Sequence, residues 1–400
     1  MNTIALFDDA TARAFEPFAL TRPASELRAG TEIVRRRWEM ALGAECIGFI
    51  GAPHLVDFEE LDAPSAITGD LPAGTIVVNS RCVPTLAPSD PWADVWTSAG
   101  RLAAVRLTRP ISGAAIRDDG IDSLAPADAT AVELGGWWLT DVWDLIRHLS
   151  PMLGSDIPHR VEGLDTVSAA EAGGAVIGAY AARVERGASI EPYVVFDASA
   201  GPILVRRGAT VAPFSRLVGP CYVGEDSTVG GGRVGNTSIG EQCRVHGEVS
   251  TTVFLGHANK SHDGFVGHSY LGRWTNLGAS SVTSNLKNTD GSVALWTPAG
   301  MRDTGMQFLG TFFGDHAKTA IGTRLTTGGV IGAGANVFAT FMSPKVVVPF
   351  SWGGSTDAPV YNVDKFLEVA ERVMSRRHVA LSERARRWLA AAHAARWQVV

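Results

Sequence analysis

The stretch VRRGATVAPFSRLVGPCYVGEDSTV, residues 205–229, carries an aliphatic side chain at every sixth position. Neither an α-helix nor an alternating β-strand produces a period of six. The period recurs twice further along the chain, so that the complete set is Val205, Val211, Leu217, Val223 and Val229, then Phe265, Leu271 and Leu277, then Leu325, Ile331 and Val337. A small side chain often follows four residues later, at Ala209, Ser215, Cys221, Ser227, Thr275, Ser281 and Ala335. This hexapeptide repeat is typical of a parallel β-helix.

Each six-residue unit is expected to form one flat side of a triangular coil. The aliphatic side chain then points into the prism, the small residue fits a crowded corner, and the glycine that often follows the aliphatic residue relieves the turn. Cys221 and Cys243 occupy small positions, so we expect inert packing residues there. The repeat is interrupted between 234 and 265 and by an insertion from 286 to 318, and such interruptions often carry the site of a solenoid. The insertion is expected to pack, because it holds Trp296, Met301, Met306, Phe308, Phe312 and Phe313.

The two ends of the chain predict other architectures. In residues 1–165, helical patterns such as 32–40 and 140–149 separate four apolar runs, Ile4–Phe7, Cys46–Ile50, Thr75–Val78 and Leu102–Leu107. This alternation indicates a Rossmann-like α/β domain. After Pro349, residues 362–374 and 382–397 predict two amphipathic helices, whose arginines indicate either a polyanion site or a solvated face. The predicted domains are therefore 1–165 (α/β), 166–350 (β-helix) and 351–400 (helical).

Composition excludes several classes of protein. The 400 residues are 46% apolar and 19% charged, as expected for a globular enzyme and not for a disordered or fibrous chain. The net charge of −6 argues against nucleic-acid binding. Because no long apolar run or export signal is present, we expect a cytoplasmic protein without a membrane span. The four cysteines form no CxxC pair, which disfavours a zinc or disulfide framework.

Groups able to do chemistry concentrate between residues 247 and 288. His257, His262 and His268 lie here, but their spacing does not place them together on one face of the coil, and no carboxylate cluster completes a metal site. Only five of the 35 basic residues are lysines. Because Lys260, Lys287 and Lys318 fall in or near this region, a compact ammonium group is expected to meet a phosphate there.

The segment NKSHDGFVGHSYLGRWTNLGASSVTSNLKN, residues 259–288, together with GEVSTTVFLGHANKSHDG and GDHAKTAIG, resembles a known family. This is the family of bifunctional N-acetylglucosamine-1-phosphate uridyltransferases and glucosamine-1-phosphate acetyltransferases, and in particular a branch described as sugar nucleotidyltransferases. The motif LTRPASELRAG, residues 20–30, resembles the same branch. The resemblance implies a left-handed β-helix, a homotrimer and acetyl-CoA as co-substrate.

The resemblance also implies residue roles. His262 matches the general base that takes a proton from the sugar amine, Glu248 matches its orienting carboxylate, and Asn276 and Asn285 match positions that contact the amino sugar. An imidazole suits a base because its ordinary pKa lies near neutrality.

Two positions depart from the family pattern. Phe265 replaces a tyrosine that contacts substrate, and Ser250 replaces a lysine that meets the sugar phosphate. The missing cation could come from Lys260, Arg233 or Arg244. Because of these two changes, the sequence does not identify the acceptor sugar.

The first domain has a weaker motif, because the family's Gly-x-Gly-Thr-Arg loop is absent. Ligands of α/β sheets gather beyond the carboxyl ends of strands, which singles out Asp8 and Asp9 after the first run and Asn79 and Arg81 after the third. We consider Asp8 and Asp9 as ligands of Mg²⁺ and Arg13, Arg22 and Arg28 as phosphate contacts. The same residues are equally suited to caps, turns and surface ion pairs.

The leading hypothesis is an enzyme of sugar-nucleotide biosynthesis that transfers an acetyl group from acetyl-CoA to an amino-sugar phosphate, fused to a divergent nucleotidyltransferase-like domain. One alternative is a sugar-1-phosphate nucleotidyltransferase whose β-helix serves only for trimerisation. Others are a catalytically silent nucleotide-sugar-binding protein and a metal-dependent hydrolase.

Overall fold

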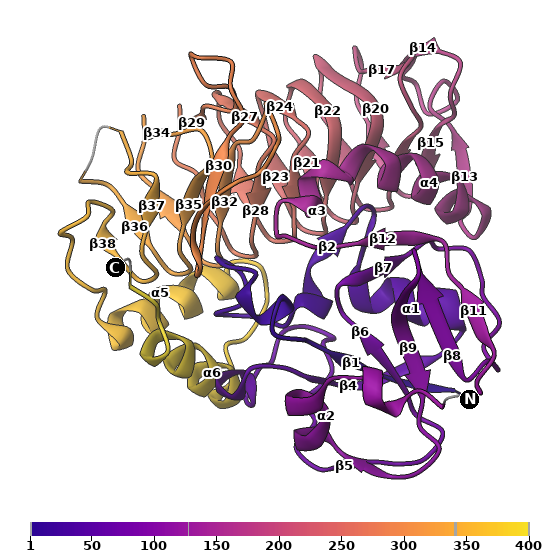
Figure 1. Cartoon of the computed structure of the whole chain (residues 1–400). Coiled ribbons are helices and arrows are strands. Elements are labelled where there is room, and N and C mark those ends of the chain that lie inside the picture. Colours follow the sequence, from indigo (N-terminus) through magenta and orange to yellow (C-terminus); the bar gives the residue numbers. More distant parts are fainter. Residues whose placement is uncertain (1, 127, 340–341, 399–400) are drawn as a thin grey trace. The chain divides into compact units, whose positions relative to one another are not determined.

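The computed structural model describes residues 2–126, 128–339 and 342–398 (Figure 1). The chain forms two compact units. The first contains the residues up to Phe15, then Ala19–Asp144 and Ser382–Ala395, and the second contains Glu16–Phe18, Leu145–Leu381 and the residues from Arg396 on. The helical residues after 351 are thus divided between the two units, while the three predicted domain limits remain predictions.

The first unit is built on a six-stranded sheet with the order β11-β8-β9-β6-β1-β4. Its central strands are buried aliphatic runs, and β1 pairs in parallel with both neighbours. The strands are β1 (Thr3–Phe7), β4 (Glu45–Ile50), β6 (Ile76–Asn79), β8 (Val95–Ser98), β9 (Arg101–Arg106) and β11 (Ala131–Glu133), and helix α1 (Val34–Leu42) lies between β1 and β4 in the chain. The predicted α/β sheet and its four apolar strands are confirmed.

The second unit is a parallel β-solenoid with three faces (Figure 1). The first face contains β18 (Ile203–Val205), β20 (Ser215–Val223), β22 (Gly232–Ile239), β25 (Val253–Phe254), β28 (Tyr270–Leu271), β32 (Thr311–Phe313) and β35 (Gly329–Ile331). The second contains β19 (Thr210–Val211), β21 (Thr228–Val229), β23 (Arg244–Val245), β26 (Asn259–Lys260), β33 (Lys318–Thr319) and β36 (Asn336–Val337). The third contains β17 (Val195–Ala198), β24 (Glu248–Ser250) and β27 (Phe265–Gly267).

The six-residue repeat forms the interior of this solenoid as predicted. Val205, Val211, Leu217, Val223 and Val229 are all fully buried in one continuous core. The small residues lie beside them, and burial raises the pKa of the Cys221 thiol to about 12. Cys221 and Cys243 are therefore packing residues.

The structure corrects the inward position that the repeat predicts for Phe265. The preceding period predicts that its side chain points inwards, but Phe265 is only half-buried and Val266 lies in the core instead. The reason is unequal coil length: Val205 pairs with Val223, eighteen residues later, but Val234 pairs with Val249, fifteen residues later, and Val249 with Val266, seventeen residues later. A fixed six-residue period therefore does not stay in phase with the inward positions.

Glycines after the aliphatic residues are required for a different reason from the predicted one. A side chain at Gly278 would lie 2.4 Å from the carbonyl carbon of Ala320 in the next coil. Turns of the solenoid instead place residues such as Asp226 (φ 56°) and Trp274 (φ 64°) in the left-handed region. The close stacking of neighbouring coils, and not the turn, excludes a larger residue at Gly278.

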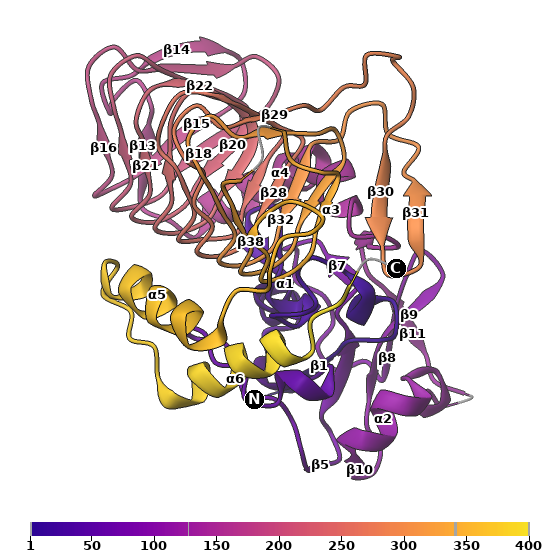
Figure 2. The same cartoon turned by 90° about the vertical axis from the view of Figure 1, so that its left-hand side faces the viewer.

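The insertion forms a hairpin, β30 (Ala294–Thr297) and β31 (Gly300–Asp303), which projects from the coils (Figure 2). It packs as predicted through Trp296, whose ring lies 4.2 Å from that of Trp397. Met301 and Phe308 are exposed, however, and Phe312 belongs to strand β32 of the solenoid.

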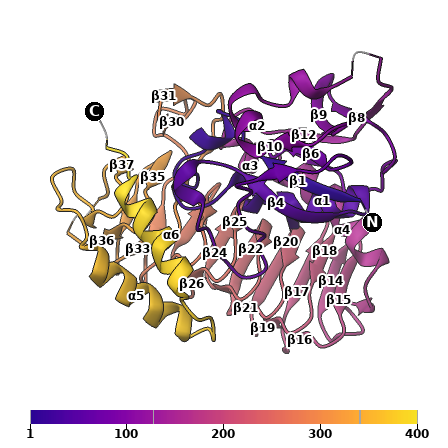
Figure 3. The same ribbon diagram turned by 90° about the horizontal axis from the view of Figure 1, so that it is seen from below.

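Helix α5 (Val363–Ser375) lies beside the coils that carry β33 and β36 (Figure 3). The Asn362 side chain caps its start by accepting a hydrogen bond from the Lys365 amide (3.1 Å). The ring of Phe366 on the buried face of α5 lies 5.0 Å from Phe350 and 5.7 Å from His316. Helix α6 (Glu383–Ala394) belongs to the first unit. Both predicted helices are confirmed. In the part of the chain that the structure describes, no helix has the length and apolar character needed to cross a membrane.

Candidate functional site

A column of polar side chains runs along the second face of the solenoid. The strand register places Arg244 beside Asn259, Asn259 beside Asn276, and Asn276 beside Lys318. Successive strands of a sheet are about 4.8 Å apart, so the column is about 14 Å long. A hydrogen bond from Asn259 Nδ2 to Asn276 Oδ1 (2.6 Å) fixes the two central amides.

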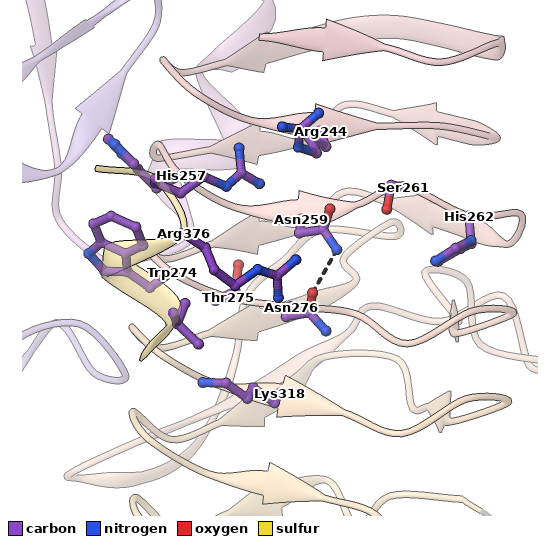
Figure 4. Close-up of a pocket in the computed structure, with 12 residues that line it drawn as sticks. Arg244, His257, Asn259, Ser261, His262, Trp274, Thr275, Asn276, Lys318 and Arg376 are labelled. Atoms are coloured by element: carbon purple, nitrogen blue, oxygen red, sulfur yellow. Dashed lines mark hydrogen bonds between the residues drawn. The ribbon is translucent and has the colours of Figure 1, made fainter. Parts of the chain in front are cut away.

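This column forms one wall of a pocket of about 450 Å³ (Figure 4). Ser261 and His262 extend the wall from the turn after β26, while Val373, Arg376 and Arg377 come from the end of α5. His257, Trp274 and Thr275 complete the lining. Arg376 extends from α5 toward the Asn259–Asn276 pair (Figure 4). Three predicted substrate-binding residues, Arg244, Asn276 and Lys318, therefore share one pocket with the predicted base.

The pocket is strongly cationic. Its lining contains Arg244, Lys318, Arg376 and Arg377 and no Asp or Glu. Burial lowers the pKa of Lys318 to about 8, and Lys318 Nζ donates a hydrogen bond to the His316 carbonyl (3.0 Å). Burial and the neighbouring Arg244 lower the pKa of Arg377 from its ordinary value. Lys318 and Arg377 are partly removed from water without a matching carboxylate in the lining, while Arg244 and Arg376 are exposed, and such a cationic lining suits an anionic ligand.

His262 lies at the rim of the pocket with an exposed side chain. Within the described residues, its imidazole forms no hydrogen bond or ion pair, so both ring nitrogens are accessible to a ligand. The turn beneath it is held by Lys260, whose Nζ donates hydrogen bonds to the carbonyls of His262 and His246. The neighbouring turn residue Asp263 is bonded to His246 (Oδ1 to Nε2, 3.0 Å).

Lys260 itself points into the coil. It is 2% exposed, and burial lowers its pKa to about 8. Since its ammonium group is occupied by main-chain carbonyls, Lys260 stabilises the turn that carries His262 and is not positioned to meet a substrate phosphate.

The other predicted acetyl-transfer residues lie outside this pocket. Glu248 and Phe265 are paired on the third face, and both are at least partly exposed. Asn285 Nδ2 lies 2.9 Å from His268 Nδ1, and burial lowers the pKa of His268 to about 4. Arg233 is exposed in β22, and Lys287 Nζ donates to the Ser292 carbonyl. The roles of these residues remain predictions.

Asp8 and Asp9 follow β1 at the carboxyl edge of the first sheet, as predicted. Asp9 forms an ion pair with Arg81 (2.7 Å) and accepts hydrogen bonds from Asn79 (3.0 Å) and the Ala12 amide (2.9 Å). Burial alone would raise the pKa of Asp9, but the hydrogen bonds from Arg81 and Asn79 lower it. Burial raises the pKa of Asp8 to about 6.

This arrangement does not fit Mg²⁺. Both oxygens of Asp9 are bonded to donors, and no group of three or more His, Cys, Asp or Glu side chains able to hold a metal occurs in the described ranges. Arg13 Nη1 donates to the Asp8 carbonyl (3.1 Å). Arg22 and Arg28 are buried: Arg22 pairs with Glu60 (2.8 Å), and Arg28 donates to the Thr31 carbonyl. The expectation that Arg22 and Arg28 contact phosphate or form surface ion pairs is corrected, because both hold the interior of the first unit together.

Sequence patterns did not identify Arg376, Arg377, His257 or Trp274 as pocket residues. Arg376 and Arg377 lie just after the predicted helix 362–374, and Arg376 is exposed while it lines the pocket. Local spacing could not place them there, because strands β23 and β26 of the same pocket lie more than a hundred residues earlier in the chain. His257 and Trp274 pack ring against ring (4.3 Å) behind the column.

The chain combines an α/β sheet unit with a β-solenoid that carries a cation-lined pocket. Residues 4–163 match the family model described as sugar nucleotidyl transferase. The chain is also 33% identical over 110 residues to the bifunctional protein GlmU of Jannaschia sp. (strain CCS1). That alignment covers 26% of this chain and 22% of the relative. These matches confirm the resemblance predicted from the sequence, for residues 4–163 and for the aligned 110 residues.

A solved hexapeptide transferase family protein from Anaplasma phagocytophilum aligns with 55% of this chain and 96% of its own. It is 13% identical, with a TM-score of 0.19. The solenoid of this chain is defined by its own strand pairing.

Proposed function

We propose that the solenoid catalyses transfer of an acetyl group from acetyl-CoA to the amine of an amino-sugar phosphate, as a step of sugar-nucleotide biosynthesis. The observation that carries the proposal is the exposed, unbonded His262 at the rim of a pocket lined by four cations and no carboxylate. A base beside an anion site suits an acceptor that bears both an amine and a phosphate, and a donor that is itself polyanionic.

In the proposed reaction, the amine nitrogen attacks the carbonyl carbon of the thioester while the His262 imidazole takes the amine proton. The carbon–sulfur bond then breaks, and the CoA thiolate leaves and receives a proton. Arg244 and Lys318 hold phosphoryl oxygens, and Asn276 offers an amide to the sugar. Lys260 acts only by fixing the main chain of the turn at His262.

The test measures acetyl-CoA consumption with a panel of amino-sugar phosphates, using wild type, His262→Ala and His159→Gln as a matched control on helix α4 (Leu149–Glu162). We expect His262→Ala to lower kcat at least 100-fold for the accepted sugar, within the range of general-base catalysis, and His159→Gln to leave it unchanged. Equal rates in wild type and His262→Ala would remove His262 as the base.

A second candidate function is sugar-1-phosphate nucleotidyl transfer by the first unit, with the solenoid as a trimerisation scaffold. Its support is that the matched family model lies over residues 4–163, the part of the chain that holds the Asp8–Asp9 edge. Pyrophosphate release from nucleoside triphosphates and sugar 1-phosphates would measure it. In that case Asp9→Asn lowers the rate and His262→Ala does not. Light scattering of the intact chain tests the proposed homotrimer.

A further inference from the structure

An uncharged stretch of the chain lies exposed at one end of the solenoid. Residues 175–181, AVIGAYA, are all exposed, and residues 172–182 contain no charged side chain, although 19% of the whole chain is charged. Strand β14 (Ala175–Gly178) lies within this stretch, at the end of the solenoid opposite β38 (Trp352–Gly353) (Figure 1). Terminal repeats of a solenoid need a polar outer face for solubility, so an exposed apolar strand at this place requires an explanation.

Strand β14 is an edge strand with one open side. Among the strands that the structure describes, it pairs with β17 alone, to which it runs parallel. The Ala175 amide donates a hydrogen bond to the Val194 carbonyl of that neighbour (2.9 Å), so alternation along the ladder turns the amides and carbonyls of Val176 and Gly178 to the open side. Natural edge strands are commonly protected by a charged side chain or a proline, and β14 contains neither.

Aromatic side chains extend this apolar surface. Tyr180 is exposed just after β14, and Tyr193 and Phe214, in the turns that precede β17 and β20, are 74% and 77% exposed. The rings of Tyr193 and Phe214 stack on one another, with 5.6 Å between centroids and 3° between planes. Together with Val176 and Ile177 these rings form the β14 patch. Contiguous apolar surface of this kind marks an interaction site.

The chemistry of the β14 patch favours a second copy of this chain as the partner. An open strand edge is self-complementary, because a two-fold axis sets two identical edges antiparallel, so that amides of each meet carbonyls of the other. The charges on the neighbouring strands, Asp197 of β17 and Arg216 of β20, are paired with each other and offer little to a charged partner. Since each copy carries a net charge of −6, two copies approach at the lowest electrostatic cost through an uncharged surface.

We propose that two copies of this chain associate through their β14 edges, with Tyr180, Tyr193 and Phe214 packed in the interface. The proposal is independent of the proposed function, because no residue of the β14 patch lines the cation-lined pocket. The homotrimer expected from the resemblance would pair into a hexamer through this interface. The mass in solution is therefore an even multiple of the 42.3 kDa chain.

The experiment is sedimentation velocity of the full chain over a range of concentrations, for wild type, Ile177→Asp and Val56→Asp. We expect Ile177→Asp to halve the wild-type mass, because pairing would enclose two like charges in an apolar interface. Val56→Asp is the matched control and should leave the mass unchanged, since Val56 is an aliphatic residue of the first unit with almost the same exposure (48% against 50% for Ile177).

A second variant tests the stacked rings without straining the backbone. Tyr193 and Phe214 have positive φ values of 66° and 62°, a region that asparagine tolerates better than most residues. The double variant Tyr193→Asn, Phe214→Asn is expected to stay folded, as thermal melting shows, and to raise the dissociation constant of the pair at least tenfold.

Covalent capture tests the strand edge itself. Because the two-fold axis brings identical strands together, Ile177→Cys is expected to form an intermolecular disulfide under mild oxidation. Ala115→Cys, at an exposed position of α2 (Gly113–Asp119), is the control. An odd multiple of the chain mass in wild type, an unchanged mass in Ile177→Asp, or equal yields of linked dimer in the two cysteine variants would overturn the proposal. An unchanged mass would assign the β14 patch to a different partner.

Discussion

The ammonium group of Lys260 donates a hydrogen bond to the main-chain carbonyl of His262, and a second one to the carbonyl of His246 (2.8 Å). A rare lysine placed inside the coil thus joins two neighbouring turns of the solenoid. This relationship connects the stability of the fold with the position of the proposed base.

Lys260→Ala is expected to lower the free energy of unfolding by about 2–4 kcal/mol, because it removes a charged donor from two carbonyls and leaves a cavity. Urea denaturation measures the loss. Lys365→Ala, on the exposed face of α5, is the control and should change stability by no more than about 0.5 kcal/mol. If both variants unfold alike, Lys260 does not hold the turn.

The one-residue shift at Phe265 makes opposite predictions for adjacent positions. Val266→Ala should cost about 1–3 kcal/mol of stability, because its side chain fills the solenoid interior. Phe265→Tyr should cost almost nothing, because the ring is half-exposed, and the added hydroxyl should change the relative kcat/KM values among amino-sugar phosphates. A large stability loss in Phe265→Tyr would show that Phe265 is the core residue after all.

Anion binding in the pocket should take up protons near pH 8. Burial lowers the pKa of Lys318 to about 8, so the free side chain is partly deprotonated at that pH. A bound phosphate favours the charged form and raises this pKa, so that a proton enters from the buffer and affinity falls as the pH rises above 8. Calorimetry with coenzyme A in buffers of different ionisation enthalpy measures the uptake. Lys318→Met should abolish it, and unchanged uptake in that variant would assign the proton elsewhere.

Asp8 and Asp9 are expected to respond to pH with opposite signs. The pKa of Asp8 in the folded chain, about 6, lies above the ordinary value of 3.8, so its contribution to stability is present at low pH and is lost as the pH rises through 6. Asp8→Asn should therefore be more stable than wild type at pH 7.5, by at most about 3 kcal/mol, and no more stable at pH 4.

Asp9 is the matched comparison for Asp8. Its lowered pKa means that its contribution is present above about pH 4 and is lost at more acid pH. Asp9→Asn should consequently destabilise the chain at pH 7.5, by about 1–3 kcal/mol, with a smaller effect in acid. Urea denaturation of both variants at pH 4 and pH 7.5 measures these changes in the free energy of unfolding. If Asp8→Asn and Asp9→Asn change stability in the same direction at both pH values, the environments described for Asp8 and Asp9 are wrong.

Local spacing predicted much of the fold, because a period of six has one simple structural solution. It gave the wrong inward residue at Phe265, since the preceding coils are shorter than eighteen residues and differ in length, which a fixed period does not record. Asp9 and Arg81 were correctly placed at one sheet edge by the strand rule. The ion pair between Asp9 and Arg81 depends on side-chain geometry, which residue spacing cannot predict.

Recognition of the site was limited by contacts between distant parts of the chain. The resemblance singled out His262 and Asn276, and the structure brings them to the pocket that also contains Arg244 and Lys318. Arg376 reaches the same pocket only because α5 packs against coils that are far away in sequence. No local pattern distinguishes a helix face that meets solvent from one that meets another part of the fold.

Each coil contributes a single side chain to the polar column, from Arg244 through Asn259 and Asn276 to Lys318. A substitution at one of these four positions changes one step of the column, while the buried aliphatic residues that support the coil stay as they are. Ligand preference in such a scaffold is modular, so natural variation or laboratory selection can adjust it coil by coil without rebuilding the interior.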